Sequence, residues 1–496
     1  MDLIFTLLVL LSLAAGLWFR RALNRGPGLK LPPGPTPLPI FGNILSLGRK
    51  PHQSLARLAK VHGPIMLLKL GTRTAVVISS PESARAVLHK QDQAFCNRFV
   101  PDAAGVLDHD RNSVAWMPVG DQWRVIRKIC KDKMLSGQRM DAGRGLRMEK
   151  LKNLVGHVEE CCASGRAVDI GKAAFTTSLN LMWTSLFSAD AAELGSSSSG
   201  EFRDIVSGIM ELVGKPNMSD YFPILRGLDP QGILRSVEAY FGKCFAVFDE
   251  IIDRRVEMKS AGDDRTVWND MLETLLEFNR EDPSGFTLDH VKNLLLDLFV
   301  AGTDTTSGTV EWAMAELIRN PNKLQKARHE LRTVLSPDQL IQESDISRLT
   351  YLQSIIKETF RLHPTLPLLL PRKATKDTEL NGYLIPKNAQ IMVNTWAIGR
   401  DTEVWKDADK FIPERFMETD IDFRGQHFEL TPFGGGRRIC LGLPLAYRMV
   451  HIMLASLVKD YEWKLEEGVM KVDMEEKFGL SLQKAISLRI VPNKIV

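Results

Sequence analysis

A glycine-rich segment near the C-terminus holds the residue with the clearest chemistry. It reads Pro432-Phe433-Gly434-Gly435-Gly436-Arg437-Arg438-Ile439-Cys440-Leu441-Gly442, and the pattern after it predicts a helix over 443–459. Free amide groups and the positive end of a helix favour the thiolate form of a nearby cysteine, which is the form that binds metal. With no His, Asp or second Cys nearby, Cys440 cannot complete a zinc site. A lone thiolate suits a metal whose other ligands come from a macrocycle.

A long helix is predicted from Thr287, its expected N-cap, to Asn320, which precedes a proline. It would extend about 50 Å and must therefore cross the core. Its middle, Ala301-Gly302-Thr303-Asp304-Thr305-Thr306-Ser307, consists mostly of poor helix formers. Poor helix formers at the centre of a strong helix indicate a functional segment. Gly302 is expected to let a flat ligand approach the backbone. A simple kink of the helix is the alternative.

Several motifs together resemble one known family. The pattern Phe433-x-x-Gly436-x-Arg438-x-Cys440-x-Gly442 matches in full the haem-binding signature of the cytochrome P-450 monooxygenases. Glu358-x-x-Arg361, Pro413-Glu414-Arg415-Phe416 and Trp123-x-x-x-Arg127 also match that family's motifs. The resemblance extends over essentially the whole chain. It implies the cytochrome P-450 fold, mainly α with small β-sheets, and haem b as the cofactor, with Cys440 as the axial ligand of its iron.

The resemblance also implies how the chain holds the haem. Cationic forks suit carboxylates, and the haem propionates are expected to be bound by Trp123, Arg127, Arg372 and Arg438. Further contacts are expected from Phe433, Gly436, Gly442 and Ala301. Glu358, Arg361 and Arg415 resemble the family's buried charge lock, whose role is folding and haem retention. His363 is either one more propionate donor or a purely structural residue.

The segment Ala301-Gly302-x-Asp304-Thr305-Thr306 resembles the family's oxygen-activation motif. The resemblance implies that Thr305 stabilises reduced dioxygen and positions water, while Asp304 relays protons. The chain lacks a flavin or nicotinamide fingerprint, so the electrons must come from a partner. NADPH cytochrome P-450 reductase is expected, with cytochrome b5 as a second candidate. A basic docking patch would consist of Arg124, Lys128, Lys131, Lys133 and Arg437, unless these residues form an ordinary solvated face.

The segments that the resemblance places around the substrate are largely apolar, which suits a small lipophilic molecule. The expected pocket residues, which core packing would explain equally well, are Phe99, Val100, Phe299, Leu366, Leu368, Leu369 and Leu480. Residues 165–181 and 220–225 resemble the plant branch of the family that includes geraniol 8-hydroxylase and ferruginol synthase, so a mono- or diterpenoid is expected. Alternatives are a phenolic, tyrosine-like or xenobiotic substrate, a haem-thiolate isomerase or dehydratase, and a non-catalytic haem protein. The intact Asp304-Thr305 pair disfavours an isomerase or dehydratase.

The composition excludes several other classes of protein. Among 496 residues, 64 Lys and Arg stand against 60 Asp and Glu, giving a formal charge of +4. Nucleic-acid binding is therefore not expected, because it requires a clear excess of basic residues. The six cysteines show no C-x-x-C spacing, so reduced thiols are expected rather than a disulfide framework or a zinc site.

The N-terminal residues predict a membrane anchor. Leu3 to Phe19 carries no charge, and a helix of this length, about 25 Å, suits the thin endoplasmic reticulum membrane. Arg20 and Arg21 follow it and place the rest of the chain in the cytosol. We therefore predict a single-pass anchor in membrane lipid at 1–21, a basic and Pro-rich linker at 22–40, and a haem-thiolate catalytic domain at 41–496. A cleaved signal peptide is the alternative, but its positive leading region is missing.

The same topology makes a prediction about glycosylation. Asn217-Met218-Ser219 is the only glycosylation sequon of the chain. It should remain unmodified in the cytosol, so that a glycan at Asn217 would contradict the orientation.

Overall fold

The computed structural model describes residues 29–191, 197–260, 268–336 and 339–495. The predicted anchor at 1–21 and the first part of the predicted linker lie outside these residues. Within them, no helix combines the length and the apolar composition that crossing a membrane requires.

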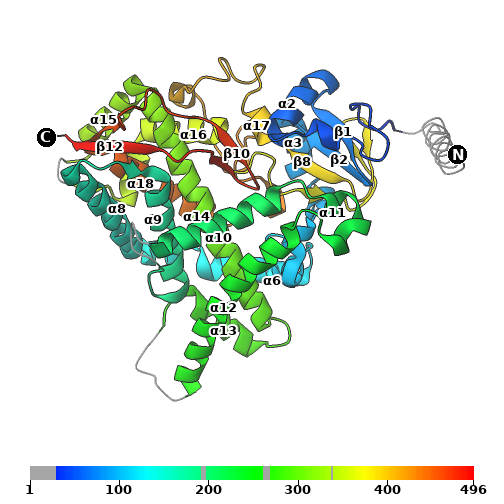
Figure 1. Ribbon diagram of the computed structural model, residues 1–496, viewed down its shortest axis with the longest axis horizontal. Coiled ribbons are helices and arrows are strands. Elements are labelled where there is room, and N and C mark those ends of the chain that lie inside the picture. Colours follow the sequence, from blue (N-terminus) through cyan, green and yellow to red (C-terminus); the bar gives the residue numbers. More distant parts are fainter. Residues whose placement is uncertain (1–28, 192–196, 261–267, 337–338, 496) are drawn as a thin grey trace, which may run out of the picture.

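Helices form most of the described chain, and the sheets are small (Figure 1), as predicted. The longer helices are α2 (Pro51–His62), α6 (Asp121–Ile129), α8 (Arg144–Ser164), α9 (Ile170–Phe187), α10 (Ser197–Gly214), α12 (Ile233–Ser260), α13 (Met271–Glu281), α14 (Leu288–Arg319), α15 (Pro321–Val334), α16 (Thr350–Leu362) and α18 (Leu443–Lys459). Short helical segments are η1 (Ile44–Ser46), α3 (Pro81–Arg85), η2 (Ala86–Lys90), α4 (Asp92–Phe95), η3 (Asp102–Asp108), α5 (His109–Asn112), η4 (Cys130–Met134), α7 (Gly137–Ala142), α11 (Met218–Tyr221), η5 (Pro223–Leu228), η6 (Glu343–Arg348), α17 (Thr395–Ile398), η7 (Pro413–Phe416) and η8 (Gly436–Arg438).

Helix α14 runs through the middle of the molecule (Figure 1) and packs against α9, α18, α13 and α16. Its predicted limits are confirmed, with Thr287 as N-cap and Asn320 as C-cap. The helix predicted over 443–459 is confirmed as α18. The place of the missing Gly302 side chain is filled rather than open, because a Cβ there would lie 2.8 Å from the Met182 sulfur of α9. Gly302 thus lets α14 and α9 approach closely, and it also lines the cavity beside Cys440, so the approach of a flat ligand to its backbone stays a prediction.

The main sheet has the strand order β1-β2-β8-β5-β3. Its strands are β1 (Ile65–Leu70), β2 (Arg73–Ile78), β8 (Gln390–Val393), β5 (Arg372–Lys373) and β3 (Asn97–Arg98). The register of the antiparallel β3–β5 pair places Arg98 opposite Arg372. Smaller sheets are formed by β4 (Val168–Asp169), β12 (Arg489–Lys494) and β9 (Tyr461–Leu465), by β6 (Thr378–Leu380) and β7 (Tyr383–Ile385), and by β10 (Glu476–Phe478) and β11 (Leu482–Lys484).

The described part of the predicted linker is attached to the sheet. The backbone amide of Leu67 in β1 donates to the Pro33 carbonyl at 2.8 Å. The Asn43 side chain donates to the Pro35 and Thr36 carbonyls at 3.2 and 3.3 Å. A Cβ at Gly34 would lie only 1.9 Å from the Leu67 oxygen, so the glycine allows this contact.

The sequon is buried in the folded protein. Asn217 is only 1% exposed and caps α11, where its side chain accepts from the Ser219 amide at 3.2 Å. A glycan on this side chain does not fit the native burial of Asn217 on either side of a membrane. An unmodified Asn217 therefore does not report the orientation of the chain.

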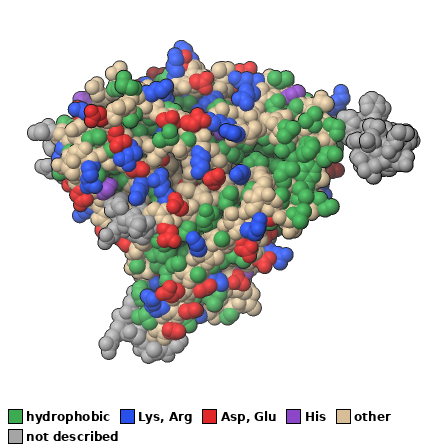
Figure 2. Space-filling model, in the orientation of Figure 1, with side chains coloured by type: hydrophobic (Ala, Val, Ile, Leu, Met, Phe, Trp, Pro, Cys, Tyr) green, Lys and Arg blue, Asp and Glu red, His purple; other side chains and the backbone are tan. Residues whose placement is uncertain are grey.

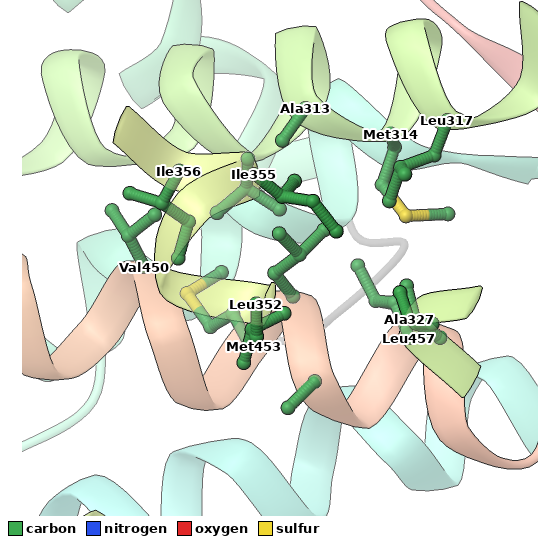
Figure 3. Packing of buried hydrophobic residues seen from close by; sticks show 14 of the residues in the cluster. Ala313, Met314, Leu317, Ala327, Leu352, Ile355, Ile356, Val450, Met453 and Leu457 are labelled. Atoms are coloured by element: carbon green, nitrogen blue, oxygen red, sulfur yellow. The ribbon is translucent and has the colours of Figure 1, made fainter. Parts of the chain in front are cut away.

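A large core cluster fixes the helix that follows Cys440. Figure 3 shows Ala313, Met314 and Leu317 of α14 facing side chains of α16 and α18. Those partners are Leu352, Ile355, Ile356, Val450, Met453 and Leu457, all at most 2% exposed. Full burial of one such side chain stabilises by about 1.5–3 kcal/mol. Helix α18, which follows the Cys440 segment, is thus held against α14 and α16.

Candidate active site

A cavity of about 320 Å³ lies between the middle of α14 and the segment that contains Cys440. It brings together many residues predicted from distant motifs. Those that line it are Cys440, Phe433, Gly442, Arg127, Arg372, Arg438, Ala301, Thr305, Leu366, Leu369 and Leu480. Trp123, Gly436, Asp304, Phe99, Val100, Phe299 and Leu368 are not among its lining residues.

The backbone around Cys440 presents its sulfur to this cavity. Gly434 and Gly436 have φ values of +68° and +65°, which glycine adopts without strain. The Cys440 amide donates to the Phe433 carbonyl at 3.1 Å and closes the loop. Burial raises the pKa of the Cys440 thiol, while the amides of Gly442 and Leu443 and the charge of Arg127 oppose that rise. These amides and Arg127 favour a thiolate but do not outweigh the effect of burial on the pKa, so the thiolate expected from the sequence stays a prediction.

Gly436 allows the loop to meet a buried carboxylate. Asp92 accepts from the Arg437 amide at 3.1 Å and from the Arg372 guanidinium at 2.9 Å. A Cβ at Gly436 would lie 2.2 Å from the Leu88 oxygen and 2.9 Å from Asp92. The glycine of the signature thus allows close packing against the protein behind the loop, and its predicted contact with the cofactor stays a prediction.

Four guanidinium groups line the cavity: Arg98, Arg127, Arg372 and Arg438. Most of their hydrogen bonds go to backbone carbonyls, for example from Arg98 to Leu370 at 2.9 Å and from Arg127 to Ile439 at 2.5 Å. Arg372 is paired with Asp92. Burial and the charges of Arg438, Arg372 and Arg127 lower the pKa of Arg98 well below its usual value. Such an excess of buried positive charge fits the two propionates of a haem.

Arg98 was missed by the sequence analysis, although its neighbours in the chain were considered. Its role depends on the β3–β5 pairing, which no local pattern in one sequence indicates. Trp123 acts behind these arginines. Its indole donates to the Val114 carbonyl at 3.1 Å, and its ring lies 4.5 Å from the Arg438 guanidinium.

The two residues of the oxygen-activation motif face different surroundings. Thr305 lines the cavity, and its hydroxyl donates to the Ala301 carbonyl one turn earlier at 2.7 Å. Asp304 is 4% exposed and accepts from the Gln483 side chain of β11 at 2.5 Å. Burial raises the pKa of Asp304, and Ser481 and Gln483 lower it. Proton relay by Asp304 therefore requires its carboxyl group to turn from β11 toward the cavity, and the relay stays a prediction.

The predicted charge lock is present as a buried network. Arg361 donates to both Glu358 oxygens at 2.7 Å, and Arg415 donates to one of them at 3.1 Å. Arg361 also donates to the carbonyls of Gly399, Ala408 and Lys410. His363 lies elsewhere, bonded to Glu316 at 2.8 Å and stacked on Trp312, so its role is structural.

The remaining predicted pocket residues lie outside the main cavity. Phe99 and Leu368 line a second, smaller cavity of about 90 Å³, which shares Leu369 and Leu480 with the first. Phe299 is fully buried in a cluster of aromatic rings, 5.5 Å from Trp183. Val100 packs against the same core. Core packing, the alternative noted for these residues, accounts for both.

Comparison with known proteins agrees with this site. The sequence pattern of the family described as Cytochrome P-450 matches residues 32–489. Cytochrome P-450 76T24 of Catharanthus roseus is 50% identical over 497 residues, which are 100% of this chain and 99% of that protein. Ferruginol synthase of Isodon rubescens is 47% identical over 95% of this chain and 96% of its own length. Geraniol 8-hydroxylase of Swertia mussotii is 49% identical over 93% of each chain.

The match spans the proline-rich segment that begins at residue 32, the charge lock, the oxygen-activation motif and the Cys440 loop. This confirms the resemblance drawn from the motifs. Membership of this family implies a haem-thiolate cofactor, a redox partner and dioxygen as co-substrate. The chain belongs to the cytochrome P-450 family and is a cytochrome P-450 monooxygenase, similar to proteins named geraniol 8-hydroxylase and ferruginol synthase.

Proposed function

We propose that this monooxygenase hydroxylates a small plant mono- or diterpenoid, with electrons from NADPH cytochrome P-450 reductase and cytochrome b5 as a second donor. The substrate class is supported most directly by the sequence identity of this chain, 49% with a geraniol 8-hydroxylase and 47% with a ferruginol synthase. The largely apolar wall of the cavity, with Leu366, Leu369 and Leu480, suits a lipophilic molecule of that size.

Haem b is the cofactor we propose, and Cys440 would bind its iron through the thiolate. When bound through a thiolate, haem supplies an electron-rich iron that favours cleavage of the O–O bond of dioxygen. Arg98, Arg127, Arg372 and Arg438 would neutralise its two propionates, in agreement with their burial and mutual repulsion. Trp123 holds Arg438 in place from behind.

The chain's own residues would then orient the substrate, exclude water and deliver protons. Apolar side chains of the cavity keep bulk water from the reacting atoms. The Thr305 hydroxyl, which is bonded to Ala301 in this structure, can turn to donate into the cavity and hold a water molecule there. Asp304, released from Gln483, would supply the proton.

Attachment to the endoplasmic reticulum membrane, through the anchor predicted at 1–21, is supported by an apolar surface near the start of the described chain. Leu38, Ile40, Leu45, Ile224 and Leu228 are each more than half exposed. Figure 2 shows hydrophobic side chains gathered on the side where β1, β2 and α11 lie. Exposed apolar patches of this kind mark contacts with membranes or proteins.

The first experiment combines a spectrum with turnover. The reduced protein exposed to carbon monoxide should show the red-shifted Soret band of thiolate ligation, and Cys440→Ser should abolish it. Microsomes that contain the chain and a plant reductase should consume NADPH and dioxygen and hydroxylate a member of a terpenoid panel. A normal spectrum without turnover of any terpenoid would overturn the substrate class, and a normal spectrum in Cys440→Ser would overturn the site.

A second experiment tests whether the Thr305 hydroxyl serves proton delivery or only the structure of the helix. Thr305→Ala should release peroxide in place of product, because the cavity loses its hydroxyl. Thr303 provides a matched control, since its hydroxyl bonds back to Phe299 at 2.7 Å but does not line the cavity. Thr303→Val should therefore leave the ratio of product to NADPH unchanged. Equal coupling in both variants would contradict the assignment of Thr305.

A further inference from the structure

A polar cluster lies in the otherwise apolar wall of the cavity. Asp297 of α14 and His109 of α5 both line it, and the His109 Nε2 lies 3.2 Å from the Asp297 carboxylate. Ser113 donates to both Asp297 oxygens at 2.7 and 2.8 Å, and the Ala115 amide lies 3.4 Å from one of them. None of these groups takes part in the haem site described above.

Both ring nitrogens of His109 have partners in the protein. Its Nδ1 lies 2.5 Å from the Asn293 side-chain oxygen. The amide nitrogen of Asn293 donates to the Asp289 carbonyl at 2.8 Å, which fixes the orientation of that amide. The other ring nitrogen, Nε2, faces the Asp297 carboxylate. The His109 ring is therefore fixed between Asn293 and Asp297 at the cavity wall.

The chain holds His109 in this position against local preferences. Leu107 and Asp108, the two residues before it, both have positive φ values, 53° and 55°. Side-chain-bearing residues rarely adopt this conformation, and they keep it only where the surroundings impose it, often at binding sites. The ring of Phe241, another cavity residue, packs edge-on against His109 at 4.9 Å.

The position of Asp297 on α14 relates this cluster to the reacting end of the cavity. Asp297, Ala301 and Thr305 are spaced at i, i+4 and i+8, so they share one face of the helix, and all three line the cavity. Eight residues separate Asp297 from Thr305 by roughly 12 Å along the axis. A group bonded at Asp297 and a carbon beside Thr305 thus belong to opposite ends of one small molecule.

We propose that Asp297, held by His109, is a subsite for a hydroxyl group of the substrate and directs oxidation to the end of the molecule remote from that hydroxyl. The inference rests on the proposed function and specifies its substrate class as an alcohol. A neutral hydroxyl can donate to the carboxylate lone pairs that Ser113 and His109 leave free. A hydrocarbon of the same shape makes no hydrogen bond here and leaves the polar side chains of Asp297 and His109 facing apolar surface.

The test compares matched ligands in the haem-loaded protein by the shift of the Soret band on binding, which gives Kd without turnover. The pairs are geraniol with its deoxygenated hydrocarbon, and 1-decanol with decane. The wild-type chain should bind each alcohol about tenfold more tightly than its hydrocarbon. Asp297→Asn should reduce this ratio to less than about twofold while the Kd of the hydrocarbons is unchanged.

A control variant separates binding of the substrate hydroxyl by Asp297 from the structural tie, the Ser113–Asp297 hydrogen bonds that join α14 to the segment after α5. Ser113 is fully buried and does not line the cavity, so Ser113→Ala weakens that tie but should keep the alcohol preference. If Asp297→Asn does not fold, His109→Gln provides the second measurement, since loss of the ring that holds Asp297 should also lower the ratio. Product analysis should show oxidation at the remote end in the wild type and a mixture in Asp297→Asn.

Wild-type ratios near one for both pairs would overturn the subsite, as would an equal loss of affinity for alcohol and hydrocarbon in Asp297→Asn. A strong preference for 1-decanol, with no hydroxylation of any terpenoid, would support the subsite and overturn the terpenoid proposal. The two failures are therefore distinguishable.

Discussion

The guanidinium of Arg98 is surrounded by like charges, and it donates to the carbonyl oxygens of Ala115 and Leu370. Burial and three neighbouring arginines disfavour its charged form, and lower its pKa. An anion bound between these groups would reverse that effect. The same side chain should thus destabilise the haem-free protein and stabilise the loaded one.

Substitution Arg98→Met is expected to act with opposite signs in the two forms. It should raise the melting temperature of the haem-free protein by about 2 °C, because one of four repelling charges is removed. It should accelerate haem loss from the loaded protein several-fold, measured by transfer to a haem-scavenging apoprotein. Arg124→Met, at an exposed arginine on α6, should change neither quantity. A loss of stability in both forms would show that Arg98 is only a structural residue.

Gly434 and Gly436 have nearly the same positive φ but different surroundings. An alanine at Gly434 meets no atom closer than 3.7 Å, so Gly434→Ala should cost only the backbone strain, about 1–2 kcal/mol. An alanine at Gly436 overlaps the Leu88 oxygen and Asp92, so Gly436→Ala should cost a further 1–3 kcal/mol, roughly. Urea unfolding and the yield of carbon monoxide-binding protein measure both. Equal effects would mean that conformation, and not contact with Asp92, selects the glycine of the signature.

At the scale of elements, a buried carboxyl group joins α11 to η3 and should make stability depend on pH. Asp220 accepts from the Asp102 amide at 2.6 Å, and burial raises the pKa of Asp220 to about 7. In the unfolded chain this carboxyl ionises near 3.8. The native state therefore holds the proton more tightly, so stability falls as pH rises from about 4 to 7, and the full loss is present above pH 7.

Asp220→Asn tests this contact between α11 and η3, because asparagine keeps an oxygen for the Asp102 amide but cannot ionise. The variant should be more stable than the wild type at pH 8, and the difference should shrink toward pH 5. Thermal unfolding from pH 5 to pH 8 measures both trends. A difference that does not vary with pH would contradict the burial of an ionising Asp220.

The sequence predicted elements better than the contacts between them. The limits of α14 and α18 follow from caps, a proline and an unbroken apolar pattern, and all of these are local signals. The arrangement of Arg98 beside Arg372 depends on a strand pair that joins residues far apart in the chain. The direction in which a helical residue faces is equally non-local. Phe299 and Asp304 flank the cavity-lining Ala301 in sequence, yet one packs among aromatic rings and the other against β11.

At the scale of the whole molecule, the charge is nearly balanced, with 64 basic and 60 acidic residues. Net charge therefore cannot attract a reductase, and any steering must come from the distribution of charge on the surface. In the predicted docking patch, Arg124 is paired with Asp121 at 2.6 Å, and Arg437 with Asp92 at 2.8 Å. Lys128, Lys131 and Lys133 are exposed on and just after α6 and are the remaining cations of the patch.

Reversal of two of these charges should weaken reductase docking in a salt-dependent way. In Lys131→Glu/Lys133→Glu, the reductase concentration for half-maximal turnover should rise about tenfold at low salt, because attraction becomes repulsion. At about 0.5 M salt the difference should fall below twofold, since charges separated by more than a few ångström are then screened. The matched control is Lys464→Glu/Lys471→Glu, which makes the same change in net charge at and after β9, outside the patch. The carbon monoxide spectrum should be normal in both proteins. If the reductase concentration for half-maximal turnover rises in both variants, or if high salt does not reduce its rise, the patch is an ordinary solvated face.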